Sequence, residues 1–560
     1  MKLVAHLIAS DVRRFRWLFL AWLLIEVTAT TLSGIQPTFS ATTRPFDLIG
    51  IVTNLLWLAD LLLLIVMVPL VVQADPLVGT DAFWMTRPIP PLSLLAAKVL
   101  LLGIVIAVVP IVTEGAVMIA YHVPIADALR VAAQNVVFQT LWLMILMAGA
   151  SVTPTLGRYA LLFASVVIGF ALFASITALI ETGLGRHTPL LFGLPEPGNS
   201  TASLLLLLLL TAAGFGMMAV QYATRSWVRS VAVGVAAVIL AIYAAPQWRW
   251  SLFGAPPVVP EWAREQTALR LLSIPGTVKA DVPADYFGAE NELRSVHAQV
   301  RLDALPPGWS ARARLESGEL QLRDGRRITS WGSYATHLIM AGETPPPDLL
   351  TRNLLDVDRF MDSVRKEEPV VVFSLLDHEL TRLGQAHGRY DGHFRVELTH
   401  HEVEAVMPLR LGAVYQRGAF RIMVDAVRRD VRSASVYAHE SDASSLFDGE
   451  EGPTRAYYLR NSQRREAVLG TPNHRSTETP IPRLLPMVIH IDGQTGFSAS
   501  ARYFRFGPRG RPEESDPVID DGWLAGAELV IVRSTPSGAV GRTLAIDDFS
   551  IPAAVRSSSR

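Results

Sequence analysis

The first 250 residues contain a series of long apolar runs, and this pattern limits the possible fold more than any other feature of the chain. A helix needs about 20 apolar residues to cross the ~30 Å hydrocarbon core of a bilayer. Seven runs meet that length, and one of them includes the unbroken leucine run 204–210. The seven runs cover residues 17–34, 50–73, 97–121, 131–153, 159–180, 202–222 and 228–246. The sequence therefore predicts an α-helical, multi-pass membrane bundle of about seven spans over residues 1–250.

The basic residues in the short connections predict how this bundle is oriented. Short cytoplasmic connections carry an excess of Lys and Arg. With the N-terminus inside, nine basic residues fall on the cytoplasmic side and three in the outer connections between spans. The nine are Lys2, Arg13, Arg14, Arg16, Arg87, Lys98, Arg158, Arg225 and Arg229, and the three are Arg44, Arg130 and Arg186. Seven spans then place everything after Trp250 outside the cytoplasm, so we expect a protein of the cytoplasmic (inner) membrane.

Composition excludes several classes of function. The chain has 50 basic and 51 acidic residues and a net charge of −1, so no overall field favours nucleic acid as a partner. It has no cysteine, which rules out disulfides, thiolate metal sites and cysteine nucleophiles. Lipid is the partner that the apolar runs require.

Three carboxylates fall inside predicted spans: Glu26, Asp60 and Glu114. A charge at the centre of a spanning helix costs about 2.5–3.5 kcal/mol on insertion scales, and such residues usually face a polar interior. One interpretation is that the three line a polar path for cargo or protons. The alternative is that they are protonated or hydrogen-bonded residues of helix packing, assisted by neighbours such as Asn135 and Gln139.

A polar, proline-rich segment joins the second and third spans. It reads Gly79-Thr80, then Phe83-Trp84, then Arg87-Pro88-Ile89-Pro90, then Leu94-Leu95 and Lys98. This order of residues between two spans resembles the permease subunits of type-2 ABC transporters, the export class. The resemblance covers roughly residues 1–225. It implies that the segment forms a short coupling helix that docks in a groove of a separate ATP-binding subunit. The implied docking residues are Gly79, Thr80, Phe83, Trp84, Arg87 and Pro88.

The resemblance also implies an assembly. The permease would work as a homo- or heterodimer of permease subunits, and ATP would be hydrolysed on the partner subunit. The chain itself has no G-x-x-x-x-G-K-[ST] phosphate loop, which is consistent with that division of labour. Two departures from the family pattern concern the substrate class: Asp75 stands where a Glu often precedes Gly-Thr, and a seventh span re-exports the C-terminus.

After a proline-rich linker at residues 251–290, the chain changes character. Residues 291–550 alternate apolar and polar side chains in short runs separated by turn signals such as Asp391-Gly392 and Asp521-Gly522. This pattern predicts an all-β, sandwich-like extracytoplasmic domain, either as one module or as two with a boundary near 370–390. One helix is expected over Thr351–Lys366, and residues 551–560 are expected to be a disordered tail.

Histidines are frequent in one part of this exported half, from His378 to His401. On an alternating strand, His400 and His401 point to opposite faces and cannot easily share a metal ion. There is also no H-E-x-x-H and no G-x-S-x-G motif. We therefore expect solvated strand residues here, with no metal site, no cofactor and no catalytic residue in this chain.

Two functions compete at this point. The first is the permease subunit of an ABC-type export system, which couples ATP hydrolysis on a separate subunit to movement of a substrate across the cytoplasmic membrane. The second is a membrane-anchored extracytoplasmic binding or scaffold protein without transport activity. An envelope hydrolase is a third and weaker alternative, because no catalytic motif supports it.

Overall fold

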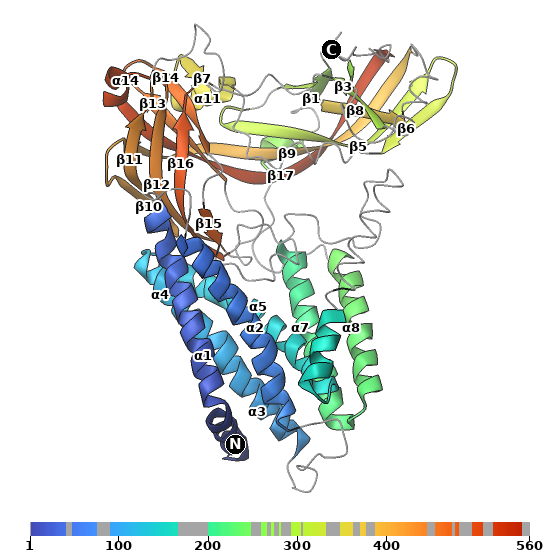
Figure 1. Ribbon diagram of the computed structural model, residues 1–560. Helices are drawn as coiled ribbons and strands as arrows, with labels where there is room; N and C mark the ends of the chain where they lie inside the picture. Colours follow the sequence, from blue (N-terminus) through green and yellow to red (C-terminus); the bar gives the residue numbers. More distant parts are fainter. Residues whose placement is uncertain are drawn as a thin grey trace, which may run out of the picture.

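A computed structural model gives the fold. It describes residues 2–40, 48–75, 90–165, 168, 200–247, 259–265, 270–273, 279–281, 293–298, 300–303, 306–331, 348–361, 370–376, 387–444, 454–472, 477–480, 496–507 and 519–550. The helices come first in the chain and the strands follow. Figure 1 shows the β domain at one end of the helical bundle and the N-terminus at the other.

Most of the helices are apolar along their length. Their order is α1 Lys2–Ser40, α2 Leu48–Gln73, α3 Pro91–Gly103, a π-helical turn Ile104–Val108, α4 Val109–Ala120, α5 Ile125–Val152, α7 Ser200–Thr224 and α8 Trp227–Gln247. Four continuous segments are long and apolar enough to cross a membrane: Lys2–Ile35, Ile51–Gln73, Pro91–Ala120 and Ile125–Val152. Shorter apolar stretches occupy α7 and α8, at Leu208–Thr224 and Trp227–Ala241. The expected number of seven spans is not confirmed, because most of residues 159–180 lies outside the described part.

The helical half carries apolar side chains on its outside as well as its inside. Trp22, Met67, Leu102 and Met147 form part of the buried core of the bundle. Large apolar side chains are also exposed all along the helices, among them Leu24, Leu55, Leu62, Leu161 and Ile239. A helix that is apolar all round is buried in a large core or in a membrane. The helical half is therefore built to be surrounded by hydrocarbon.

Nearly all strands pair antiparallel. They are β1 Arg270–Ser273, β2 Lys279–Asp281, β3 Leu293–Ala298, β4 Val300–Asp303, β5 Trp309–Leu322, β6 Arg327–Trp331, β7 Arg359–Met361, β8 Val370–Leu376, β9 His387–Pro408, β10 Val414–Arg417, β11 Phe420–Arg429, β12 Ala434–Ser444, β13 Thr454–Asn461, β14 Glu466–Pro472, β15 Thr477–Pro480, β16 Gly496–Phe506 and β17 Ala527–Ser550. The main sheet has the order β10-β11-β12-β16-β14-β13-β17-β9-β5-β6. Short helices α9 Glu261–Arg264, α11 Asp348–Leu355 and α14 Asp521–Ala525 accompany it. The expected all-β architecture is confirmed as a large antiparallel sheet domain.

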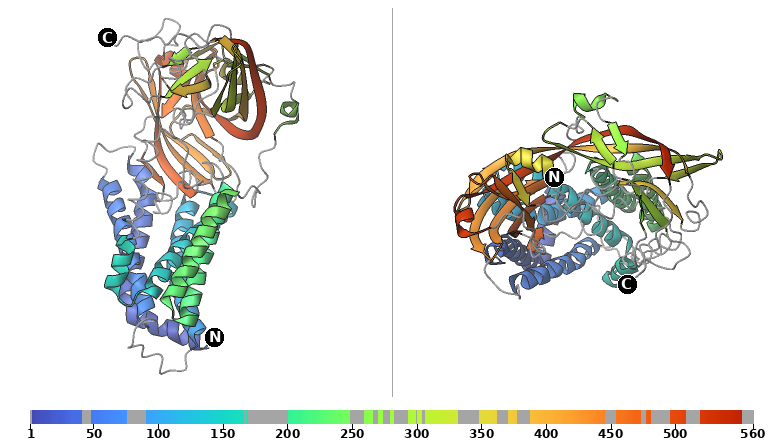
Figure 2. Two further views of the ribbon diagram at one scale, coloured as in Figure 1. Left: turned by 90° about the vertical axis from the view of Figure 1, so that its right-hand side faces the viewer. Right: turned by 90° about the horizontal axis from the view of Figure 1, so that it is seen from above.

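Two long strands, β9 and β17, run through both lobes of this domain. Their pairing extends from Pro408 opposite Glu528 to His387 opposite Ser550, with register shifts on the way. One end belongs to a proximal lobe (residues 400–444, 454–472, 496–507 and 519–535), whose core contains Phe420, Phe504 and Leu529. The other end belongs to a distal lobe (the described residues between 259 and 331, with 387–399 and 539–550), with Tyr390, Phe394 and Phe549 in its core. Figures 1 and 2 show how the β9–β17 ribbon bridges the two.

The proximal lobe curls almost into a barrel. Its path begins at β10 and ends at β9, and these two edges meet through side chains. The hydroxyl of Tyr415 donates to the backbone oxygen of Glu404 (3.2 Å), and Arg417 pairs with Glu402 (3.4 Å). Curling in this way covers the edge of β10, which would otherwise be open to pairing with other strands.

The proximal lobe rests directly on the bundle. Ala443, Phe497 and Ala499, near the ends of β12 and β16, pack in one apolar cluster with Met118 and Val123 of the helical half. Polar contacts add to this cluster. The hydroxyl of Tyr121 donates to the backbone oxygen of Gly34 (2.6 Å), and the side chain of Gln416 donates to the backbone oxygen of His122 (2.8 Å). The β domain is thus joined to α1, α4 and α5 by direct packing.

The helix expected over Thr351–Lys366 is shorter and begins earlier, at Asp348–Leu355. Asp356 takes a left-handed conformation (φ 51°), and the N–H of Val357 donates to the carbonyl of Arg352 (3.1 Å). This backbone arrangement ends a helix. The chain then enters β7, so apolar periodicity alone overestimated the length of the helix.

A glycine in the proximal lobe provides a test of its packing. A Cβ at Gly470 would lie 2.6 Å from the ring of Phe506 and 2.9 Å from the backbone oxygen of Tyr457. We expect Gly470→Ala to destabilise the β domain by about 1–3 kcal/mol, because an overpacked core must move side chains or backbone. The midpoint of chemical unfolding of the purified protein measures this.

The matched control is Gly541→Ala in β17, where an added Cβ meets nothing within 4 Å. It should leave the unfolding midpoint nearly unchanged. Equal midpoints for the two variants would contradict the close packing of β14 against β16.

Candidate functional site

The described structure reaches both ends of the expected coupling segment. Gly79, Thr80, Phe83, Trp84, Arg87 and Pro88 lie outside the described residues, so their geometry is untested. The described chain stops at Asp75 and resumes at Pro90, and α3 begins with Pro91 in its first turn. Proline is well suited to that position, because the first turn of a helix does not use its N–H groups. Both ends lie at the end of the bundle opposite the β domain (Figure 1).

A buried ion cluster, the Lys98 node, joins these two ends. Lys98 of α3 is fully buried, and its Nζ lies 2.8 Å from a carboxylate oxygen of Asp11 and 2.8 Å from one of Asp75. Asp11 is on α1, and Asp75 is the last described residue before the segment. Fully buried Tyr222 of α7 lies within electrostatic range of both carboxylates. The ammonium group of Lys98 thereby connects α3 to α1 and to the residues after α2, at a point close to Tyr222 of α7.

Only part of the Lys98 node was predicted from the sequence. Lys98 was expected to open the third span, but its two partners were not anticipated. Asp11 is the first acidic residue of the chain and stands next to apolar and basic residues. A lone acidic residue in such a segment is a usable signal, since an ionised side chain that is taken out of water needs a partner.

The three membrane carboxylates are all buried. Glu26, Asp60 and Glu114 are exposed by 2%, 8% and 2%. The side chain of Thr30 donates to Glu26 (3.4 Å), and the side-chain amide of Asn135 donates to Glu114. The first contact lies within α1 and the second joins α4 to α5. The hydrogen bond from Asn135 supports the helix-packing interpretation for Glu114, and the polar-path interpretation remains a proposal for all three.

Contacts between helices give the relative depths of the three carboxylates. A Cβ added at Gly34 would lie 3.0 Å from Val117, and the indole of Trp57 donates to the hydroxyl of Ser33 (3.2 Å). Gly34, Val117 and Trp57 therefore lie at about the same depth. With a rise of 1.5 Å per residue, Asp60 and Glu114 lie about 4.5 Å further from the β domain than Trp57 and Val117, and Glu26 about 12 Å further than Gly34. Asp60 and Glu114 thus lie at about the same depth and Glu26 about 7.5 Å deeper. Together the three are called the carboxylate layer.

The β domain has a polar cluster of its own inside the proximal lobe. Arg455 pairs with Glu404 and Asp442, both at 2.8 Å, and stacks on Phe420. Glu440 accepts a hydrogen bond from the hydroxyl of Tyr457 (2.7 Å). Burial raises the pKa of Glu440, and its pair with Arg502 (3.2 Å) opposes that shift. The opposite charges satisfy one another, which is the requirement for keeping them in a lobe with an apolar core.

The described histidines of the exported half do not converge on one site. The ring of His401 is buried between two hydroxyls, with Nε2 2.6 Å from Ser310 Oγ and Nδ1 2.8 Å from Ser534 Oγ. The ring of His400 packs instead on Trp309. Within the described ranges, no group of three His, Asp or Glu side chains is arranged to hold a metal ion. His378 lies outside those ranges.

Comparison with known proteins adds no assignment. No protein family matches this chain, and no curated protein matches it.

The Lys98 node can be tested by removing its cation. Lys98→Met leaves the buried Asp11 without a counter-charge and also removes the partner of Asp75, whose side chain is 34% exposed. Breaking a buried pair such as Lys98–Asp11 costs about 3–5 kcal/mol. We expect a clear loss of thermal stability of the protein purified in detergent. Asp11→Asn and Asp75→Asn, added to Lys98→Met, should recover part of that loss.

The control for this prediction is Lys2→Met, a change at an exposed lysine at the start of α1. If Lys98→Met were no less stable than Lys2→Met, the buried ion cluster would not exist.

His401 predicts a pH dependence of the β domain. Burial, and to a smaller degree the neighbouring His400, lower the pKa of His401 from 6.5 to about 4. The unfolded chain therefore binds a proton at this residue in the window from about pH 6.5 to about pH 4, whereas the folded chain does not. The stability that depends on neutral His401 is complete above pH 6.5 and is lost as the pH falls through this window, by up to about 3 kcal/mol.

The contribution of His401 to stability can be measured by chemical unfolding of the parent protein and of His401→Gln at several pH values between 4 and 7.5. The parent should lose more stability on acidification than the variant. Parallel curves would show that His401 takes no part.

Proposed function

We propose that this chain is the membrane permease subunit of an ABC-type export system. In this proposal it lies in the cytoplasmic membrane with its N-terminus in the cytoplasm and its β domain outside. A separate subunit binds and hydrolyses ATP, and the permease acts as a homo- or heterodimer. The cargo leaves the cytoplasm through the helical half.

The observation that supports this proposal best is the Lys98 node. Asp75 and Lys98 flank the proposed coupling segment, and the node ties both flanks to α1 through Asp11. A partner that pushes or turns the segment would act on α1, α2 and α3 as one unit, because separating them exposes a buried charge.

The position of the segment provides further support. It joins the bundle at the end opposite the β domain (Figure 1), so an ATPase and the exported lobes would not compete for space. Between the two ends, the carboxylate layer of Glu26, Asp60 and Glu114 offers buried polar groups along the way. These residues would line the path of the cargo or of protons.

The coupling segment yields the decisive prediction. Phe83→Ala with Trp84→Ala removes the aromatic side chains that would fill a groove of the ATP-binding subunit. We expect an ATP-hydrolysing partner to copurify with the parent protein in detergent and to be reduced at least about tenfold with the double variant, the loss typical of deleting interface hot spots.

Trp227→Ala is the matched control, since Trp227 is an exposed aromatic at the same end of the bundle. It should retain the partner. Full retention by Phe83→Ala with Trp84→Ala, or the lack of any ATPase companion of the parent protein, would favour the alternative of a membrane-anchored binding or scaffold protein.

A further inference from the structure

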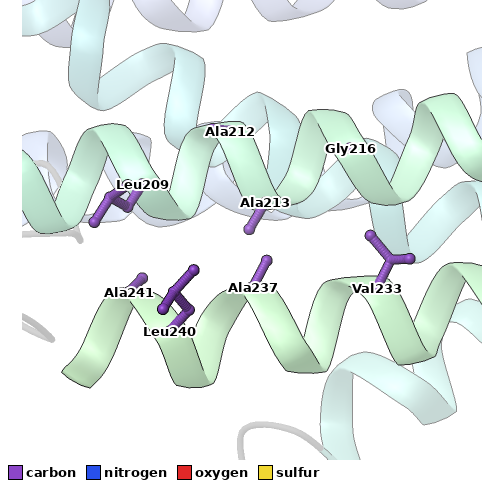
Figure 3. A pocket seen from close by; sticks show the side chains of 8 residues that line it. All are labelled: Leu209, Ala212, Ala213, Gly216, Val233, Ala237, Leu240 and Ala241. Carbon is purple, nitrogen blue, oxygen red and sulfur yellow. The ribbon is translucent and has the colours of Figure 1, made fainter. Parts of the chain in front are cut away.

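The hairpin of α7 and α8 forms an open apolar pocket with a volume of about 200 Å³. Small residues line it from both helices: Ala212, Ala213 and Gly216 from α7, and Ala237 and Ala241 from α8. Figure 3 shows these two helices side by side with the lining residues between them. No polar side chain lines the pocket, so it suits a ligand made only of hydrocarbon at this depth.

The pocket opens towards the outside of the bundle. Leu240 and Val233, which line it, are exposed by 63% and 39%, and Ala212 is also exposed. For a helix surrounded by hydrocarbon, the outside is the acyl region of the membrane. The opening is therefore accessible to the tails of lipids and not to water-soluble ligands.

One end of the pocket lies close to two cations. Arg225 and Arg229 are exposed at the turn between α7 and α8, and Trp227 lies between them, 59% exposed. With a rise of 1.5 Å per residue, Val233 is about 6 Å and Ala241 about 18 Å along α8 from Arg229. This distance matches about half of the ~30 Å hydrocarbon thickness, the depth of one leaflet.

We propose that the α7–α8 pocket binds one acyl chain of an anionic phospholipid. The phosphate of this lipid lies at Arg225 and Arg229, with Trp227 at the level of the headgroup. Tryptophan is enriched at that level of membrane proteins, and basic residues near the bilayer surface attract anionic lipids. This site does not depend on the proposed transport function.

A helix of a second subunit fits the pocket less well. An α-helix with its side chains is about 10–12 Å across. Beside the pocket the two helices of the hairpin are in close contact, because a Cβ at Gly234 of α8 would lie only 2.8 Å from the sulfur of Met217 on α7. A whole helix therefore cannot enter between them. A single methylene chain can lie in the narrow space that remains.

The test uses the full-length protein, purified in detergent and stripped of lipid. Phosphatidylglycerol and phosphatidylcholine are added separately, and native mass spectrometry counts the lipids that stay bound. Thermal unfolding measures the stabilisation by each lipid. We expect one phosphatidylglycerol per chain to be retained in preference to phosphatidylcholine, and to raise the melting temperature.

Two variants address the two parts of the site. Ala212→Leu fills the mouth of the pocket from an exposed position and should abolish the retained lipid. Arg225→Gln with Arg229→Gln should keep the pocket but reduce the preference for phosphatidylglycerol by about 30-fold. Ala236→Leu, exposed on α8 outside the pocket, and Arg158→Gln, an exposed arginine at the same end of the bundle, are the controls and should behave like the parent.

Equal retention of both lipids by the parent protein would overturn the proposal, as would full retention by Ala212→Leu. A change in the number of subunits caused by Ala212→Leu, with lipid binding unaltered, would also overturn it and would assign the pocket to a partner helix. If Ala212→Leu does not fold, the variant Arg225→Gln with Arg229→Gln tests the proposal alone. An unchanged preference of this variant for phosphatidylglycerol over phosphatidylcholine would overturn the proposal.

Discussion

The structure depends above all on the apolar outer surface of the helical half. In hydrocarbon no water can satisfy a backbone N–H or C=O, so the chain must satisfy these groups within helices. An ionised side chain within the hydrocarbon must also find a partner inside the bundle. The Lys98 node and the carboxylate layer therefore carry the free-energy cost of burying charged or polar groups, and local ion pairs or hydrogen bonds offset that cost. They are better guides to function than the much more numerous apolar contacts.

The two ends of the bundle are built differently. At the end with the N-terminus, a single ammonium group holds α1, α2 and α3 together through Asp11 and Asp75. At the other end, an apolar cluster around Val123 and Phe497 joins the helices to the proximal lobe. Movement of the first end would be transmitted along rigid helices to the second, since packed helices shift as units. The β9–β17 ribbon continues this connection from the proximal lobe to the distal lobe (Figure 2).

Much of this could be predicted from the sequence, and the part that could not has a physical reason. Apolar length predicts spans such as α2 and α5, and alternation predicts strands such as β9, because both patterns are local. The pairing of Lys98 with Asp11 joins residues far apart in the chain, and no local pattern encodes it. The same is true of Tyr121 and Gly34, and of the lobes that share β9 and β17. Helix α11 ends where Asp356 adopts a left-handed backbone conformation. The spacing of apolar residues does not predict such a conformation.

The central claim is that the coupling segment and the β domain lie on opposite sides of a membrane. The cysteine-free chain allows a direct test with two single-cysteine variants, Asp81→Cys in the segment and Leu411→Cys at a 77% exposed position of the β domain. A maleimide that cannot cross membranes should label Leu411→Cys once the outer face of the cytoplasmic membrane is accessible. It should label Asp81→Cys only after that membrane is permeabilised. Labelling of both variants from the same side would contradict the topology and the proposed coupling.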